Sequence, residues 1–186
     1  VGLAAIAAIF IFAFNNTATV KPQPTLPAIN LGQIFIANQD NLDFSLESNG
    51  TITDTLQTGD FIDLVPGSII KTSRDQEGYI RLGFPGQASL YVAKDTELLL
   101  KEYSESKTGI QINRGRLIVE FPEGSAGSNQ FIITSPNNDW AMIKGSRMGV
   151  FFDPVSTEFY VDCLEGTCYY LQNNEEVACE AGQHVR

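Results

Sequence analysis

The last third of the chain, residues 111–183, is interrupted by glycine at short and nearly regular intervals, and this pattern limits the possible folds more than any other feature. Short apolar runs end at or beside Gly115, Gly145, Gly166 and Gly182. Strands this short and this frequent are typical of a compact all-β body. We therefore predict an all-β fold, either a sandwich or a short β-solenoid built from many short strands.

The same pattern of turns and strands continues upstream. In Ser89–Ala93 apolar and polar residues alternate, which is typical of a strand with one buried and one wet face. Outside the amino end, no window of helical length has a convincing period of 3.6 residues. The strands expected in this part of the chain are 34–36, 61–65, 68–72, 79–84, 88–93, 97–102, 109–113 and 116–121.

The amino end has a different character. Val1–Phe14 carries no charged or polar side chain. A membrane-spanning helix needs about 20 apolar residues, so we expect this run to be the outer part of a single anchor that begins upstream. The alternative is a buried helix, although the run has no polar face. Residues 15–30 follow as a proline-rich spacer, and residues 31–186 form the folded body.

Charge excludes some partners. The chain has 12 Lys and Arg against 22 Asp and Glu, a net charge of −10 at pH 7. Nucleic-acid binding requires clustered basic residues, so nucleic acid is not an expected partner. Such an acidic body is also poorly suited to lying on an anionic lipid surface.

Three cysteines, Cys163, Cys168 and Cys179, lie in the last predicted hairpins. If Glu165-Gly166 and Asn173-Asn174 are two-residue turns, Cys168 lies opposite both other cysteines across neighbouring strands. Only one disulfide can then form within the chain. The longer loop favours Cys168–Cys179, with Cys163–Cys168 as the rival and three reduced thiols as the third possibility. A disulfide would place the body in an oxidising compartment.

Neighbouring aromatic residues provide candidates for partner contact. Phe151-Phe152, Phe159-Tyr160 and Tyr169-Tyr170 are adjacent pairs. Because neighbours in a strand point to opposite faces, one ring of each pair should face away from the core. In a two-layer sandwich, outward rings in a group mark a partner surface, and the candidates are Phe152, Tyr160 and Tyr170. In a solenoid end or a barrel wall, the same rings would be covered internally.

Three further contact candidates come from the segment between residues 140 and 147. Trp140 fits either a lid on the core or a contact anchor. Lys144 and Arg147 flank a turn, where they suit a carboxylate or phosphate group, although such residues are more often simply solvated. We identify no catalytic residue, no metal site and no cofactor site. The one histidine, His184, lies near the carboxyl end, where it is poorly placed to serve as a general base.

The order of several short motifs resembles the FecR-like domain, the extracytoplasmic β-domain of bacterial membrane-anchored regulators and envelope proteins. The resemblance covers roughly residues 55–185. The motifs that carry it are Leu56–Asp60, Gly115–Val119, Ile133–Pro136, Ile143–Ser146, Val161–Gly166 and Ala181–Gln183.

This resemblance implies a location and a type of domain. It implies a single-pass protein of the cell membrane whose carboxyl-terminal body lies on the extracytoplasmic side. The expected function is non-catalytic contact with other envelope or membrane proteins, structural or sensory. The alternatives are an accessory subunit of a large membrane complex or surface filament, and a module that binds carbohydrate or another small ligand. We expect no cytoplasmic anti-sigma segment such as the best-known regulators of this family carry, so the resemblance does not extend to transcriptional signalling.

Overall fold

The computed structural model describes residues 33–37, 40–84, 88–104, 106–121, 130–143, 147–172 and 175–186. The predicted anchor and spacer, and Lys144, lie outside these residues. The described residues are strands, turns and bends without a helix, which confirms the all-β prediction. Accordingly, this part of the chain holds no helix long and apolar enough to cross a membrane.

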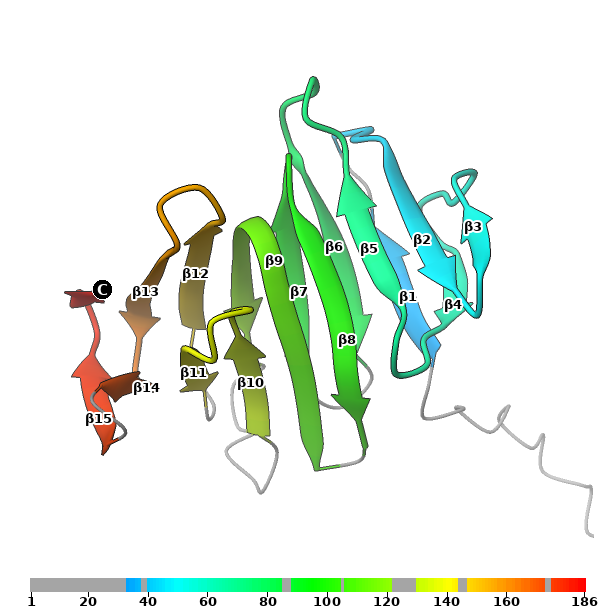
Figure 1. Cartoon of the computed structure of the whole chain (residues 1–186). Coiled ribbons are helices and arrows are strands. Elements are labelled where there is room, and N and C mark those ends of the chain that lie inside the picture. The colour runs from blue at the N-terminus through cyan, green and yellow to red at the C-terminus, as the bar shows by residue number, and fades with distance from the viewer. Residues whose placement is uncertain are drawn as a thin grey trace, which may run out of the picture.

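The strands form two sheets that share one strand, and Figure 1 shows β8 and β5 in front of β7 and β6. Sheet A contains, in spatial order, β4 (Phe61–Asp63), β1 (Gln33–Ala37), β6 (Tyr79–Phe84), β7 (Ala88–Ala93), the second part of β9 (Lys107–Glu120), β12 (Arg147–Asp153), β13 (Glu158–Glu165) and β16 (His184–Val185). Sheet B contains β3 (Thr51–Thr53), β2 (Phe44–Ser48), β5 (Ile69–Thr72), β8 (Glu97–Tyr103), the first part of β9, β10 (Gln130–Thr134), β11 (Trp140–Ile143), β14 (Thr167–Gln172) and β15 (Glu175–Glu180).

Strand β9 joins the two sheets. Its first part pairs with β8 and β10, and its second part pairs with β7 and β12. The strand bends at Gly115, which has a φ of +95°. The buried positions change phase there, because Ile112 faces the core before the bend and Leu117 after it. This phase change keeps both parts of β9 facing one core while the strand passes from one sheet to the other.

Close packing around Gly115 requires glycine. A side chain there would place its Cβ 2.6 Å from both the Asp95 carbonyl oxygen and the Thr96 Cα. The buried Thr96 hydroxyl accepts a hydrogen bond from the amide of Arg116 at 3.1 Å. The amide of Thr96 in turn donates to the Thr72 hydroxyl at 2.9 Å. These bonds satisfy buried polar groups where the ladder changes sheets.

One hydrophobic core lies between the sheets. Inward side chains alternate along β6 and β7, as the sequence predicts for half-buried strands. The largest fully buried side chains are Phe131, Ile36, Leu42, Ile80, Leu82, Leu90, Leu98, Ile112, Leu117, Ile133 and Ile143. They come from both sheets and belong to one continuous cluster. The two layers are therefore held together mainly by burial of aliphatic and aromatic surface.

The cysteine-bearing strands differ in part from the expectation. Cys168 lies directly opposite Cys179 in the β14–β15 ladder, as predicted. Cys163, however, is on β13, which pairs with β12 and β16 in sheet A and not with β14. The chain changes sheets at Gly166, where φ is +67°. A sharp turn out of the plane of the sheet thus replaces the expected hairpin.

Candidate functional site

The outer face of sheet A carries large side chains from several neighbouring strands. Strand register brings them into two neighbouring rows. In one row, successive partners across the sheet are Arg81, Tyr91, Ile118, Gly149, Asp162 and His184. In the next row, Arg116, Phe151 and Tyr160 are successive partners. This arrangement makes the outer face of sheet A an aromatic and cationic surface in an otherwise acidic chain.

Guanidinium groups lie over the aromatic rings of this face. Arg81 lies 5.7 Å from the ring centroid of Tyr91, and Arg116 lies 5.8 Å from that of Phe151. The rings of Phe151 and Tyr160 are 5.8 Å apart. Stacking on a ring restricts the orientation of a guanidinium while leaving its edge free for hydrogen bonds. The face is therefore pre-organised for a partner with acceptor groups.

The far end of the second row is closed by residues from the carboxyl terminus. The ring of His184 stacks on Tyr160 at 5.3 Å, and its Nδ1 contacts the carboxylate of Asp162. Arg186 lies over the same tyrosine ring, 5.3 Å from its centroid, and pairs with the carboxylate of Glu158. These mutual contacts hold the end of the chain against sheet A.

A hollow of about 480 Å³ opens in the middle of this face. Its lining includes Gly78, Tyr79, Tyr91, Ala93, Arg116 and Arg147; we call it the arginine hollow. The small residues leave space between the larger ones. The ring of Tyr79 meets that of Tyr91 edge to face at 5.5 Å.

A carboxylate outside the lining, that of Glu120, contacts one of the lining residues. Glu120 accepts a hydrogen bond from the Tyr91 hydroxyl, and burial together with this bond raises the pKa of Tyr91 above its ordinary value. Glu120 is also the register partner of Arg147. The Nε of Arg147 is buried and has no hydrogen-bond partner among the described residues. A buried donor without an acceptor is costly unless a ligand supplies one.

A second opening of about 540 Å³ lies at the carboxyl-terminal end of the sandwich. Trp140 and Tyr170 line it from sheet B, and Phe159 and Glu158 line it from sheet A. The Glu158 carboxylate receives both Arg186 and the Tyr160 hydroxyl. This crevice therefore brings together two of the contact residues expected from the sequence, although the Glu158 carboxylate is already engaged.

The structure separates the remaining predicted contact residues. Arg147 lines the hollow and Tyr160 lies in the aromatic row, so both are on the outer face of sheet A. Phe152 is only 2% exposed and belongs to the core, so it is not a contact residue; its neighbour Phe151 faces outward instead. Arg147 and Asp153, the polar residues at the two ends of β12, are an even number of residues from Phe151 and so lie on the same face of the strand as Phe151. That phase is the sequence signal that identifies the outward ring.

Sequence reasoning also missed an aromatic pair on the outer edge of the same sheet. Phe35 and Phe61 are 36% and 63% exposed, and their rings lie 5.5 Å apart. They are direct partners in the β1–β4 ladder. Each stands alone in the sequence, so only the strand pairing brings them together.

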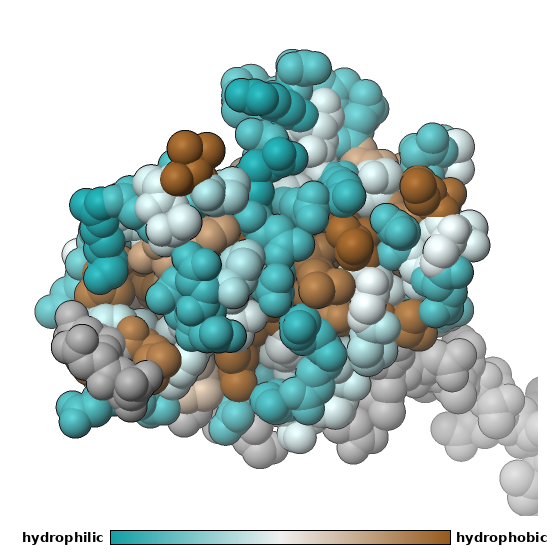
Figure 2. All heavy atoms as spheres, in the orientation of Figure 1, coloured by the Kyte–Doolittle hydropathy of each residue, from teal (hydrophilic) through white to brown (hydrophobic). Residues whose placement is uncertain are grey.

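On the other side of the molecule the apolar residues are more dispersed. Figure 2 shows the side of β8 and β5, where hydrophobic residues form small groups among hydrophilic ones. The aromatic and cationic rows therefore distinguish sheet A from this face of sheet B.

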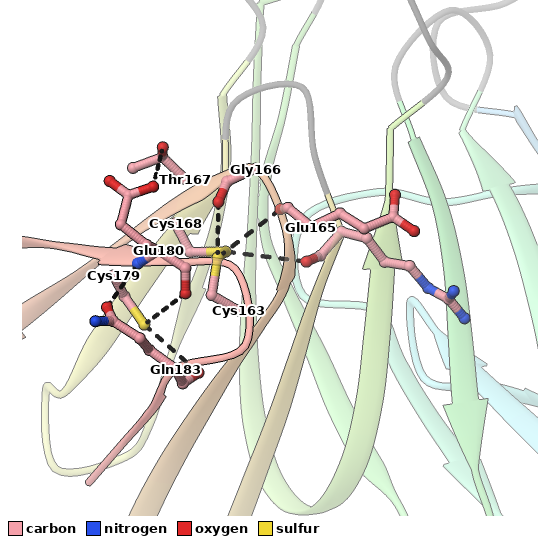
Figure 3. The surroundings of a disulfide bond; sticks show 9 residues. Cys163, Glu165, Gly166, Thr167, Cys168, Cys179, Glu180 and Gln183 are labelled. Atoms are coloured by element: carbon pink, nitrogen blue, oxygen red, sulfur yellow. Dashed lines mark hydrogen bonds between the residues drawn. A yellow bond between two sulfur atoms is a disulfide. The ribbon is translucent and has the colours of Figure 1, made fainter.

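The disulfide links the two sheets. It joins Cys163 of β13 to Cys168 of β14, with a Cα–Cα distance of 5.7 Å. The pairing favoured from the sequence, Cys168–Cys179, is therefore wrong, because the change of sheet at Gly166 brings Cys163 over Cys168. Cys179 is a buried free thiol on the neighbouring strand, within 3.6 Å of the Gln183 carbonyl (Figure 3). Burial raises the pKa of this thiol.

The described residues contain no group of three or more His, Cys, Asp or Glu side chains that could hold a metal ion. The geometry on the outer face of sheet A is suited to binding by stacking, by guanidinium hydrogen bonds and by apolar contact.

Comparison with known proteins found no match to a family model, to a curated protein or to a solved structure.

Proposed function

We propose that this chain is a non-catalytic protein–protein contact module of the cell envelope, and that its contact surface is the outer face of sheet A. The observation that carries the proposal is the pair of rows on an outward face, in which Arg81 is next to Tyr91, and Arg116, Phe151 and Tyr160 are successive neighbours. Arginine and tyrosine are enriched at the centres of protein interfaces. A monomer has no stabilising need for such a surface.

Several sequence features support the rest of the proposal. The run Val1–Phe14 suits a single membrane anchor and the prolines that follow suit a spacer. The Cys163–Cys168 disulfide suits an extracytoplasmic body. The resemblance to FecR-like domains favours the same location. Together they describe a body held outside the membrane, on which sheet A is available to neighbouring envelope proteins.

Carbohydrate binding is the less favoured function. Aromatic platforms for sugars need ring faces that are open to the ligand. Here Arg81 lies over Tyr91 and Arg116 over Phe151, so guanidinium groups already occupy ring faces. A polypeptide partner can use the same guanidinium groups as hydrogen-bond donors.

Site-specific photo-crosslinking tests the contact surface. A benzophenone amino acid would replace Phe151 on sheet A, and in a matched chain would replace Gln111, which faces outward on β9 in sheet B. In intact cells, the first chain should give a crosslinked product of defined mass and the second should not. Equal products from both positions, or none from Phe151, would overturn the proposal.

Fractionation tests the anchor. The full chain should sediment with membranes, and deletion of residues 1–14 should release it into the soluble fraction. Protease added to intact spheroplasts should cleave the body of the full chain. Protection of the body under these conditions would place it on the wrong side of the membrane for the proposed function.

A further inference from the structure

The cations of this chain are unevenly paired. Among the described residues, six of the Lys and Arg side chains form ion pairs; they are Lys71, Arg74, Lys94, Lys107, Arg114 and Arg186. Four form no ion pair with a described residue: Arg81, Lys101, Arg116 and Arg147. All three of the unpaired arginines belong to sheet A, at or beside the arginine hollow.

Two of these arginines are oriented by neutral neighbours, and the third is partly buried. The guanidinium of Arg81 donates from Nε and Nη2 to the Ser89 hydroxyl at 3.1 and 2.8 Å. Arg116 stacks on Phe151. Arg147 presents a buried Nε that lacks an acceptor among the described residues. The protein thus orients two guanidinium groups and buries part of a third without forming an ion pair to any of them. This is the arrangement expected where the counter-charge comes from a ligand.

The nearby carboxylates do not remove this need. Glu120 is hydrogen-bonded by Tyr91. Arg147 has Glu120 and Glu165 as its two register partners and forms an ion pair with neither. Asp162, in the same row as Ile118, is engaged with His184. The three guanidinium groups therefore remain without ion pairs to described residues, within a chain whose net charge is −10.

We infer that the arginine hollow binds an acidic polypeptide segment, with its carboxylates on Arg81, Arg116 and Arg147 and its aliphatic side chains against Tyr79 and Ile118. The inference rests on the proposed function and names the class of partner. Carboxylates match the fork of the guanidinium group, which Lys does not reproduce.

The spacing of the arginines suits an extended peptide. They lie on β6, β9 and β12, and β7 separates the first two. With neighbouring strands about 4.8 Å apart, β6 and β12 are separated by roughly 14 Å, the length of about four extended residues.

A short acidic segment carries few charges. The repulsion from the rest of this acidic chain is screened beyond about 8 Å at physiological salt, so contact with the hollow dominates. An anionic membrane or a long anionic polymer meets much more of the acidic surface.

Peptide binding to the full chain in detergent micelles tests the inference. The probe is a fluorescent hexapeptide of alternating Glu and Val, and the reference is the same peptide with Gln in place of Glu. Fluorescence anisotropy at low salt should show binding of the Glu peptide and little binding of the Gln peptide. Added salt should weaken the binding. Equal binding of both peptides would overturn the inference.

Charge-matched variants locate the site. Arg116→Gln and Arg147→Gln should each weaken binding of the Glu peptide by roughly tenfold or more. Lys101 is the one cation of the four without an ion pair to a described residue that lies away from the hollow. Lys101→Gln therefore removes one positive charge elsewhere, and it should leave the affinity for the Glu peptide within about twofold. Circular dichroism and urea midpoints confirm that all three variants are folded. Equal affinity across the three variants would overturn the inference.

Two other anionic probes identify competing ligands. Oligogalacturonate and phosphatidylserine vesicles should bind more weakly than the Glu peptide. If either probe binds more tightly than the Glu peptide and this binding is lost in Arg116→Gln, the ligand of the hollow is a polysaccharide or a membrane and not an acidic polypeptide. The crosslinking at Phe151 provides an independent check on the parent proposal. Crosslinking without Glu-peptide binding would retain the contact function and reject the acidic partner, whereas loss of both would reject both.

Discussion

Cys168 lies directly opposite Cys179 on the neighbouring strand, yet its sulfur is bonded to Cys163 of the other sheet. Directly paired residues of an antiparallel ladder have Cα atoms roughly 4.5 to 5.5 Å apart. That interval lies within the range of about 4.4 to 6.8 Å found across disulfides. Cys179 is therefore a second partner that is geometrically available to Cys168.

Replacement of Cys163 should redirect the disulfide. In Cys163→Ser, oxidation in a glutathione buffer should join Cys168 to Cys179, because these thiols remain on opposed positions of β14 and β15. Peptide mapping by mass spectrometry without reduction identifies the linked peptides. The unaltered chain in the same buffer is the control and should yield Cys163–Cys168. Two free thiols in the variant would contradict this expectation.

The free thiol should make stability depend on pH in the alkaline range. Burial, the largest cause, raises the pKa of Cys179. The unfolded thiol ionises near a pKa of about 8.5, so above that pH the unfolded chain releases a proton that the folded chain keeps. The free energy of unfolding should then fall from that pH up to the raised pKa of the folded state and stay unaffected below it.

Urea denaturation across this pH range, compared with Cys179→Ala, measures the effect. The decrease that belongs to this thiol should be absent from the variant. The other titrating groups act equally on both chains, so the comparison isolates Cys179. Identical pH profiles for the two chains would show that the folded thiol ionises as it does in the unfolded chain.

Gly115→Ala should destabilise the chain strongly. The new Cβ would meet the backbone at Asp95 and Thr96, and the φ of +95° is unfavourable for alanine. We expect a loss of about 3 kcal/mol in the free energy of unfolding. Gly182→Ala is the matched control: its φ is +83°, but nothing lies within 4 Å of the new Cβ. Its cost should be about 1 kcal/mol. Equal costs, measured by urea denaturation, would show that the close packing at Gly115 is unimportant.

Two neighbouring phenylalanines should respond differently to truncation. Phe152→Ala opens a cavity in the core and should cost about 3 to 5 kcal/mol. Phe151→Ala removes an outward ring that contacts Arg116 and Tyr160, and should cost about 1 kcal/mol. Thermal or urea unfolding compares the two. A larger loss for Phe151 would reverse the assignment of the two faces of β12.

Local alternation predicted some strands with their ends. The runs 79–84 and 88–93 have the bounds of β6 and β7 because their apolar residues alternate without interruption and turn residues flank them. The segment around Gly115 was less predictable. Sequence reasoning divides it into strands 109–113 and 116–121, since Arg114-Gly115 is typical of a turn. The structure contains one strand, β9, because the ladder continues through the bend while its partners change.

Long-range pairing accounts for what sequence reasoning did not find. The two-residue turn predicted before Glu175 gives the right register for Cys168 and Cys179. A local pattern does not reveal, however, that the chain changes sheets at Gly166. In the same way, Arg81, Arg116 and Arg147 are distant in the sequence. They meet at one hollow only through the pairing of β6, β7, β9 and β12.

The passage of β9 through both layers has a mechanical consequence. Two sheets joined only by loops can slide past each other or part along their interface. In this chain, either movement would have to break the ladder of β9 on one side of Gly115. A force that a bound neighbour applies to one sheet is therefore transmitted to the other sheet through β9. The two sheets should then resist shear as one mechanical unit.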